Sequence, residues 1–92
     1  MQYLGIDWGT RRAAWCAVDR HGTLREGLFS ADEDGLNRLA LMLAGEQVRG
    51  CIEMMSGAVW VRDQLATMGW EIKIADARKV KATVMKAVVR RP

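Results

Sequence analysis

The chain has 92 residues, of which 50% are hydrophobic and 27% are charged, and its formal net charge is +3. This length predicts one domain, and the composition is ordinary for a soluble globular chain. No apolar run approaches the roughly 20 residues that cross a bilayer, and Asp7 interrupts the start of the chain before a secretory signal could form. We therefore expect a cytoplasmic protein with no membrane partner.

The first third of the chain predicts three short strands, over residues 2–6, 13–18 and 23–29. The first is apolar and is followed by Asp7, and the second is the run Ala-Ala-Trp-Cys-Ala-Val. Between the second and third lies Asp19-Arg20-His21-Gly22, which carries typical turn residues. These two strands should therefore form a hairpin.

Helices and strands alternate in the rest of the chain. Ser30 and Glu33 match a capping box, so they predict the start of a helix that ends at Gly45. Residues 49–54 then predict a fourth strand. A second helix should begin at Ser56-Gly57, with a buried stripe that we expect to consist of Ala58, Val61, Leu65 and Met68.

The last segments are a strand and a helix. Gly69 should end the second helix, and residues 70–75 predict a fifth strand. A third helix is expected from Asp76 toward Pro92. With right-handed crossovers on opposite faces, this element order predicts an α/β fold, namely a five-stranded mixed sheet of order 3-2-1-4-5 with strand 2 antiparallel and helices on both faces.

Two carboxylates should meet in this sheet. Asp7 ends the first strand and Glu53 ends the fourth, which we expect to be its parallel neighbour. Neighbouring strands lie about 4.8 Å apart, so the two side chains could share one Mg²⁺ or Mn²⁺. Each acid has a simpler reading, because Asp7 could cap the turn that follows it and Glu53 could cap the second helix.

The two cysteines, Cys16 and Cys51, lie on the second and fourth strands of this sheet, with the first strand between them. Two strand spacings are roughly 9–10 Å, which exceeds the ~7 Å limit for a disulfide, so we expect two free thiols. The four tryptophans, Trp8, Trp15, Trp60 and Trp70, are expected to serve core or interface packing.

Charge is distributed unevenly along the chain. Residues 1–76 carry eight basic and eleven acidic side chains, whereas residues 77–92 carry six basic and no acidic ones. A basic segment after a mildly acidic body indicates a polyanionic partner, although it can equally be a solvated helix face. The six candidate nucleic-acid-binding residues are Arg78, Lys79, Lys81, Lys86, Arg90 and Arg91.

Four stretches, taken in order, resemble one protein family. They are GIDWGTRRAAWCAVDRHG, SADEDGLNRL, CIEMMSGAVW and IADARKVKA. Together they are similar to the N-terminal domain of the DEDD transposases of bacterial insertion elements, a RuvC-like domain with a ribonuclease H-like fold. The resemblance covers nearly all 92 residues, and its individual motifs are short.

The resemblance implies a metal-binding acidic platform that acts on DNA phosphodiesters. Asp7 matches the family's first Asp and Glu53 its Glu, so both would be catalytic and metal-binding residues. The remaining two acids and a C-terminal domain would follow Pro92, so the resemblance implies a single domain, residues 1–92, truncated at its C-terminus. Such a fragment should bind a divalent metal weakly and be inactive alone. The implied partners are DNA, a structured guide RNA and further copies of the chain.

The segment GIDWGT also resembles the first phosphate loop of actin-like ATPases and sugar kinases. In that alternative, Asp7 would act through water bound to Mg²⁺, while Gly9 and Thr10 would contact nucleotide phosphates. A third possibility is a module that dimerises or binds nucleic acid without catalysis.

Overall fold

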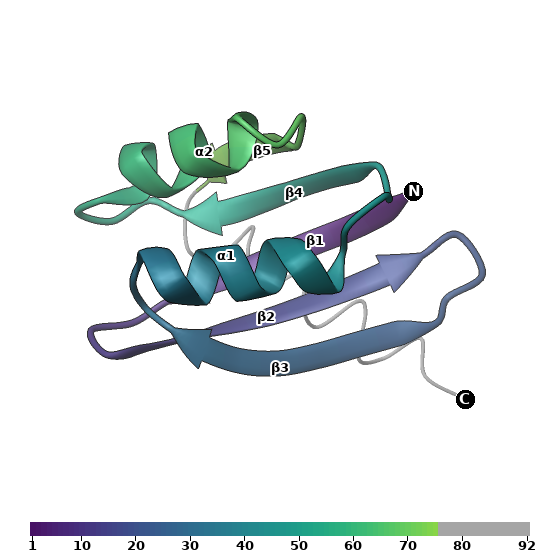
Figure 1. Ribbon diagram of the computed structural model, residues 1–92, viewed down its shortest axis with the longest axis horizontal. Helices are drawn as coiled ribbons and strands as arrows, with labels where there is room; N and C mark the ends of the chain where they lie inside the picture. The colour runs from purple at the N-terminus through teal and green to yellow at the C-terminus, as the bar shows by residue number, and fades with distance from the viewer. Residues whose placement is uncertain (76–92) are drawn as a thin grey trace.

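The computed structural model describes residues 1–75, which form a five-stranded sheet with two helices packed on one of its faces (Figure 1). The expected third helix lies outside the described residues. The elements are β1 (Gln2–Trp8), β2 (Arg12–Asp19), β3 (Leu24–Ser30), α1 (Glu33–Met42), β4 (Val48–Glu53), α2 (Ala58–Ala66) and β5 (Glu71–Ala75).

The strand order is β3-β2-β1-β4-β5, as the sequence predicts. Strand β2 runs antiparallel to both β1 and β3, whereas β1, β4 and β5 are mutually parallel. The short hairpin connections account for the antiparallel half of the sheet, and the helical crossovers account for the parallel half. The α/β class and this mixed sheet are therefore established. The finer ribonuclease H-like assignment is not confirmed.

The prediction that the crossover helices lie on opposite faces is wrong. Both α1 and α2 cover the same face of the sheet (Figure 1) and contribute to one hydrophobic core. The crossover from β3 to β4 and the crossover from β4 to β5 advance in the same direction across the sheet. Two right-handed crossovers that advance in the same direction must place their helices on the same face.

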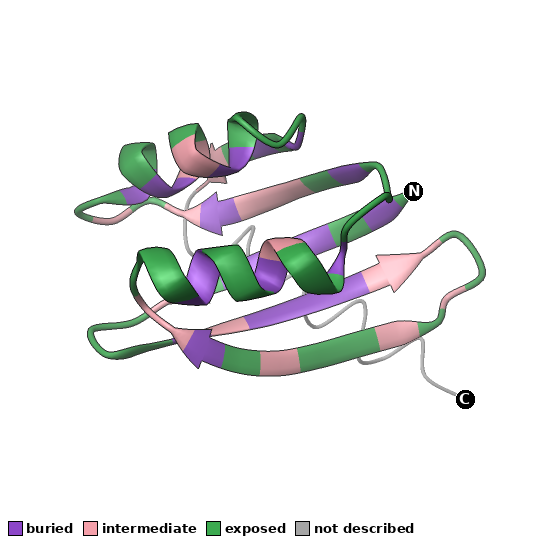
Figure 2. Cartoon of the chain, viewed as in Figure 1, coloured by how far each residue is buried: buried purple, intermediate pink, exposed green. Residues whose placement is uncertain are grey.

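The core lies between these helices and the inward-facing side chains of the sheet (Figure 2). On β1, Leu4 and Ile6 are almost completely buried, whereas Tyr3 and Asp7 are exposed. This alternation follows from the two-residue period of a strand, which sends successive side chains to opposite faces. The helices supply Leu36, Leu39 and Leu43 from the first crossover and Ala58, Val61 and Leu65 from the second. Met68, which we expected in the buried stripe, is exposed.

The predicted turn between β2 and β3 is confirmed. The Asp19 carboxylate accepts hydrogen bonds from the backbone N–H groups of His21 (2.8 Å) and Thr23 (3.0 Å). Gly22 adopts a φ of 81°, a left-handed conformation that glycine adopts without a steric penalty.

The start of α1 differs from the predicted capping box. The N-cap is Asp32, whose carboxylate accepts a hydrogen bond from the Gly35 N–H at 2.8 Å. Ser30 still belongs to β3, and its hydroxyl donates to the Asp32 carboxylate at 2.9 Å. The helix therefore begins later than the sequence predicts, because pairing with Arg12 extends β3 through Ser30.

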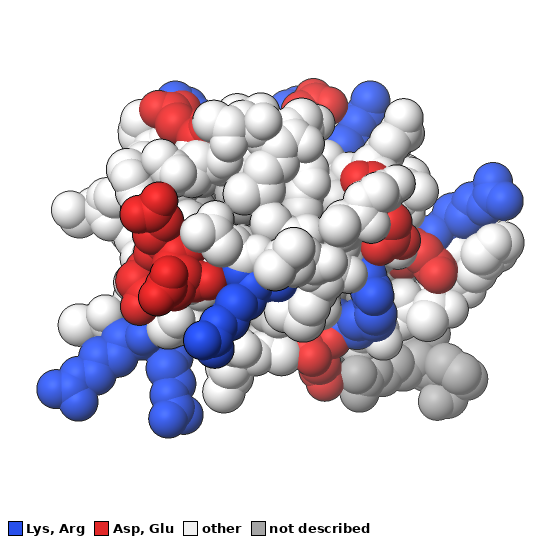
Figure 3. All heavy atoms as spheres, viewed as in Figure 1, with Lys and Arg blue, Asp and Glu red and all other residues white. Residues whose placement is uncertain are grey.

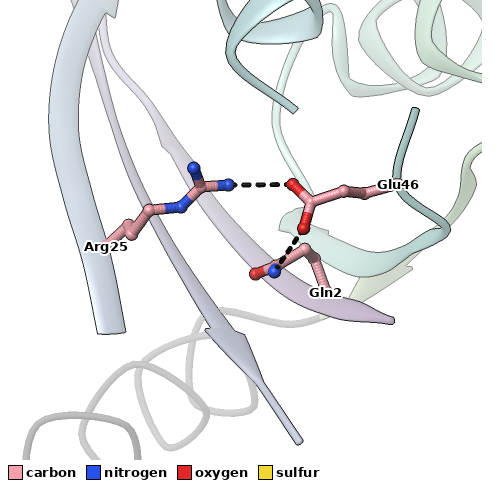
Figure 4. Close-up of polar contacts among 3 residues, drawn as sticks. All are labelled: Gln2, Arg25 and Glu46. Carbon is pink, nitrogen blue, oxygen red and sulfur yellow. Dashed lines mark hydrogen bonds and ion pairs between the residues drawn. The ribbon is translucent and has the colours of Figure 1, made fainter. Parts of the chain in front are cut away.

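A polar network connects the β-sheet to the segment that follows α1 (Figure 4). The buried Gln2 amide donates to the Glu46 carboxylate at 2.8 Å, and the Arg25 guanidinium pairs with the same carboxylate at 3.0 Å. Gln2 and Arg25 belong to β1 and β3, two strands that are not neighbours. Glu46 therefore holds together parts of the molecule that no backbone ladder joins.

Replacing Glu46 should destabilise the fold more than replacing its arginine partner. We expect Glu46→Ala to lower the free energy of unfolding by about 1–3 kcal/mol, because the buried Gln2 amide loses its acceptor. Arg25→Ala should cost less than about 1 kcal/mol, because the ion pair is partly exposed. Urea denaturation with an unchanged m-value would measure both. Equal losses for the two variants would contradict this assignment.

The helix cap should make stability depend on pH. The Gly35 N–H, and next the Ser30 hydroxyl, lower the pKa of Asp32. A carboxyl group whose pKa is lowered by folding stabilises the protein above its unfolded value of about 3.9, and this contribution is lost as the pH falls through the folded value. Asp32→Ala should therefore lower the urea midpoint at pH 7, and the difference from wild type should shrink in acid.

The matched control is Asp34→Ala, which removes a carboxylate from the first turn of the same helix but no cap. It should lower the neutral-pH midpoint less than Asp32→Ala does. A difference between wild type and Asp32→Ala that persists unchanged at pH 2 would rule out the carboxylate as the source of the effect.

Candidate functional site

The two predicted acids lie at the same end of neighbouring strands. Ile6 of β1 is paired with Ile52 of β4 in parallel register, and the next residues on the two strands are Asp7 and Glu53. Asp7 is exposed and Glu53 is half-buried. The sequence-predicted proximity of these carboxylates therefore agrees with the register of the sheet.

Both carboxylates belong to the face of the sheet opposite α1 and α2. The preceding residues, Ile6 and Ile52, are both fully buried in the core, so Asp7 and Glu53 fall on the other face by strand alternation. Across the sheet, Asp7 is paired with Ala14 on β2, and Glu53 is paired with Ala75 on β5. Within residues 1–75 no basic side chain forms an ion pair with either acid. Two adjacent carboxylates without a counter-charge repel each other, and a bound cation would relieve this repulsion.

Few potential metal ligands lie near Asp7 and Glu53 in the part of the chain that the structure describes. Among residues 1–75 no set of three or more His, Cys, Asp or Glu side chains is arranged to hold a metal ion. Among these residues, Asp7 and Glu53 therefore have no third side chain of these types placed to share a metal ion with them. Mg²⁺ is commonly bound through one or two carboxylates, with water and substrate phosphates completing its shell.

A tight turn follows Asp7 and joins β1 to β2. A Cβ atom at Gly9 would overlap the carbonyl oxygen of Arg12, so the turn needs glycine there. The Arg11 carbonyl accepts a hydrogen bond from the Ala31 N–H at 2.9 Å, which fixes the turn against the connection between β3 and α1. Gly9, Thr10, Arg11 and Arg12 are all exposed, and within residues 1–75 neither arginine forms an ion pair.

The starts of the two helices differ in charge. The N-cap and first turn of α1 carry Asp32, Glu33 and Asp34, whereas α2 begins at Gly57 with no acidic residue in its first turn. In Figure 3, acidic side chains gather where α1 begins, and basic side chains project from the adjoining corner that contains the β1–β2 turn. An anion near this corner would therefore meet less repulsion beside α2 than beside α1.

Aromatic side chains lie beside the β1–β2 turn, on the face of the sheet that α1 and α2 cover. The Trp8 ring makes edge-to-face contacts with Phe29 at 5.8 Å and with Trp60 at 6.3 Å between ring centroids. Trp15 and Trp70 are buried, as core packing predicts, but Trp60 is 41% exposed. Sequence reasoning missed its place beside the candidate site. The signal for a surface position was the predicted buried stripe of α2, which contains Ala58, Val61 and Leu65 but not Trp60.

The predicted nucleic-acid-binding residues cannot be placed relative to this site. Arg78, Lys79, Lys81, Lys86, Arg90 and Arg91 all lie outside the described residues. The interactions with DNA, a guide RNA or further copies of the chain stay predictions. Among residues 1–75 there is no helix with the length and apolar character required to span a membrane.

Neither cysteine is in a disulfide, as predicted. Both are paired with Gly5 of β1, Cys16 from β2 and Cys51 from β4. Cys16 is buried, and burial raises the pKa of its thiol, an effect that a backbone hydrogen bond with Gly5 partly offsets. Cys51 is half-buried.

Comparisons with solved structures give distant likenesses, of which one is characterised by its identity and coverage. No protein-family model matches the chain, and no curated protein matches it. Among solved structures, the chain is similar to the Aquifex aeolicus member of the Ppx/GppA protein family, with 13% sequence identity and a TM-score of 0.46. The match covers 86% of this chain but only 36% of that one. A likeness this distant does not establish what the chain does.

The comparisons contradict the transposase interpretation. No family model or curated protein supports the assignment, and the solved structure described above is a Ppx/GppA protein rather than a transposase. The motifs that suggested it were short and degenerate. DNA cleavage and transposition are therefore not assigned to this chain.

The two thiols should differ in reactivity. Because Cys16 is buried with a raised pKa and Cys51 is half-buried, we expect Cys51 to react with Ellman's reagent at least roughly tenfold faster in the folded protein. A Cys51→Ser variant should retain only the slow phase. The unfolded, non-reduced protein should titrate both thiols. Finding none would contradict the strand order as well as the free thiols.

Proposed function

We propose that this chain binds phosphate groups, together with a divalent cation, at the carboxyl ends of β1 and β4. The proposal follows the alternative resemblance of the segment GIDWGT to the first phosphate loop of actin-like ATPases and sugar kinases. One observation carries it: the turn Gly9-Thr10-Arg11 is exposed and fixed, and it directly follows the strand end whose Asp7 lies beside Glu53.

The turn offers the groups that phosphate binding requires. Gly9 lets the backbone turn sharply, Thr10 has an exposed hydroxyl that can donate to a phosphate oxygen, and the Arg11 and Arg12 guanidiniums supply positive charge. Ligands of open parallel sheets usually bind in the crevice at the carboxyl ends of the strands, where this turn lies. The acid-free start of α2 favours anions at the same edge.

The carboxylate pair fits a divalent cation. Asp7 and Glu53 lie on the same face of the sheet, and the residues paired with them on β2 and β5 are alanines. Neither acid forms an ion pair with a basic side chain within residues 1–75. Mg²⁺ prefers oxygen ligands and leaves several positions to water and phosphate, so two carboxylates are a sufficient protein contribution. When bound, the cation would neutralise charge on the phosphate groups. Asp7 and Glu53 would hold it, and the turn would orient the phosphates.

Binding of inorganic tripolyphosphate in the presence of Mg²⁺ would test the proposal by calorimetry. We expect Mg²⁺-dependent binding that weakens at least roughly tenfold, or about 1.4 kcal/mol, in Asp7→Asn and in Glu53→Gln. Asp63→Asn is the matched control, because Asp63 is an exposed carboxylate on α2 and lies outside the site. Arg11→Ala should also weaken binding, whereas Arg38→Ala, which removes an exposed arginine on α1, should not.

Two results would refute the proposal. The first is no measurable binding of tripolyphosphate by the folded wild-type chain. The second is binding that falls equally in the control variants and in the site variants, because that pattern would reflect net charge alone.

A further inference from the structure

Strand β5 lies at an edge of the sheet (Figure 1). Among residues 1–75 it pairs only with β4, so the outer side of its backbone has no strand partner there. The Ala75 carbonyl accepts a hydrogen bond from the Met54 N–H at 2.7 Å, so it points to the β4 side. Successive residues of a strand direct their backbone groups to opposite sides. Ile72 and Ile74 therefore direct their N–H and C=O groups outward, where another strand can pair with them.

The side chains at this edge form a self-complementary pattern. The run Trp70-Glu71-Ile72-Lys73-Ile74 reads apolar, acidic, apolar, basic, apolar. Trp70 and Ile72 are buried, and Ile74 packs against the core, whereas Glu71 and Lys73 are exposed on the face opposite the helices. If an identical strand runs antiparallel to this one and the pair is centred on Ile72, every acid faces a base and every apolar side chain faces an apolar one.

We propose that β5 pairs antiparallel with β5 of a second copy of the chain, with the two-fold axis at Ile72. The two Ile72 residues exchange a pair of backbone hydrogen bonds, because both their N–H and C=O groups face outward. Ile74 of each copy lies opposite Trp70 of the other on the helix face. The two sheets then form one continuous sheet, and the helices of both copies lie on the same face of it.

The charges of β5 favour this arrangement. Glu71 forms an ion pair with Arg49 of β4 at 3.1 Å, whereas Lys73 forms no ion pair within residues 1–75. In the dimer each Lys73 faces Glu71 of the other copy, and each Glu71 carboxylate lies between two cations. Opposite charges directly across a strand pair stabilise it, and like charges destabilise it.

The same charges also fix the register. A pair centred on Glu71 would place two carboxylates directly opposite each other, and a pair centred on Lys73 would oppose two ammonium groups. Only the register centred between them, on Ile72, joins acids with bases at both positions.

This inference does not rest on the proposed phosphate site. The paired strands run in opposite directions, so the carboxyl ends of β1 and β4 in the two copies lie at opposite ends of the joint sheet. A dimer of this kind therefore carries two separate candidate sites, and failure of phosphate binding would leave the dimer untouched.

Analytical ultracentrifugation of the full chain tests the proposal. We expect the wild type to populate a dimer by roughly 100 µM. Lys73→Glu sets acids opposite acids and Glu71→Lys sets bases opposite bases, so each should weaken self-association at least roughly tenfold. Mixing these two variants in equal amounts should restore the dimer, because each acid then meets a base. Restoration also shows that both variants are folded.

Arg20→Glu is the matched control, because it makes the same change of charge in the exposed β2–β3 turn, away from β5. It should leave the dimer intact. A wild-type chain that is monomeric at about 1 mM would overturn the proposal. A dimer that persists in both charge variants would place the contact elsewhere and would also overturn it. So would a mixture that stays monomeric while circular dichroism shows both variants folded.

Discussion

The pairing of β1 with both of its neighbours is the constraint on which the site depends. Its antiparallel partner β2 closes the turn that follows Asp7, and its parallel partner β4 brings Glu53 alongside. A shift of one residue in the register of β1 would turn Asp7 into the core and Leu4 out of it. The burial of Leu4 and Ile6 therefore determines which face the carboxylates occupy.

The two ends of the sheet differ in how their polar groups are satisfied. Where β1 begins, Glu46 accepts hydrogen bonds from Gln2 and Arg25 and ties separate elements together. Where β1 ends, Asp7 and Arg11 have no ion-pair partner within residues 1–75. Polar groups without an ion-pair partner within residues 1–75 are the candidates for contact with a ligand. This contrast places stabilising interactions at one end of the strands and the candidate binding groups at the other.

Local sequence patterns predicted most of the fold, because strands, turns and helix caps depend on residues that are close together in the chain. Short apolar runs separated by turn residues identified the strands, and the mixed sheet order followed from connection lengths and right-handed crossovers. The separation of Cys16 and Cys51 then followed from strand spacing alone. The cap of α1 was misplaced because Ser30 and Asp32 are both good caps, and only the extent of β3 decided between them.

The sequence by itself determined the elements, their order in the sheet and the closeness of Asp7 to Glu53, because these depend on side-chain period and chain connectivity. The shared face of both helices follows from this strand order and right-handed crossovers, so the prediction of opposite faces misapplied that rule. Tertiary structure alone decided the contacts of Trp8 with Phe29 and Trp60 and the pairing of Arg25 with Glu46. These contacts join residues far apart in the chain, and no local pattern encodes which distant side chain a residue will meet.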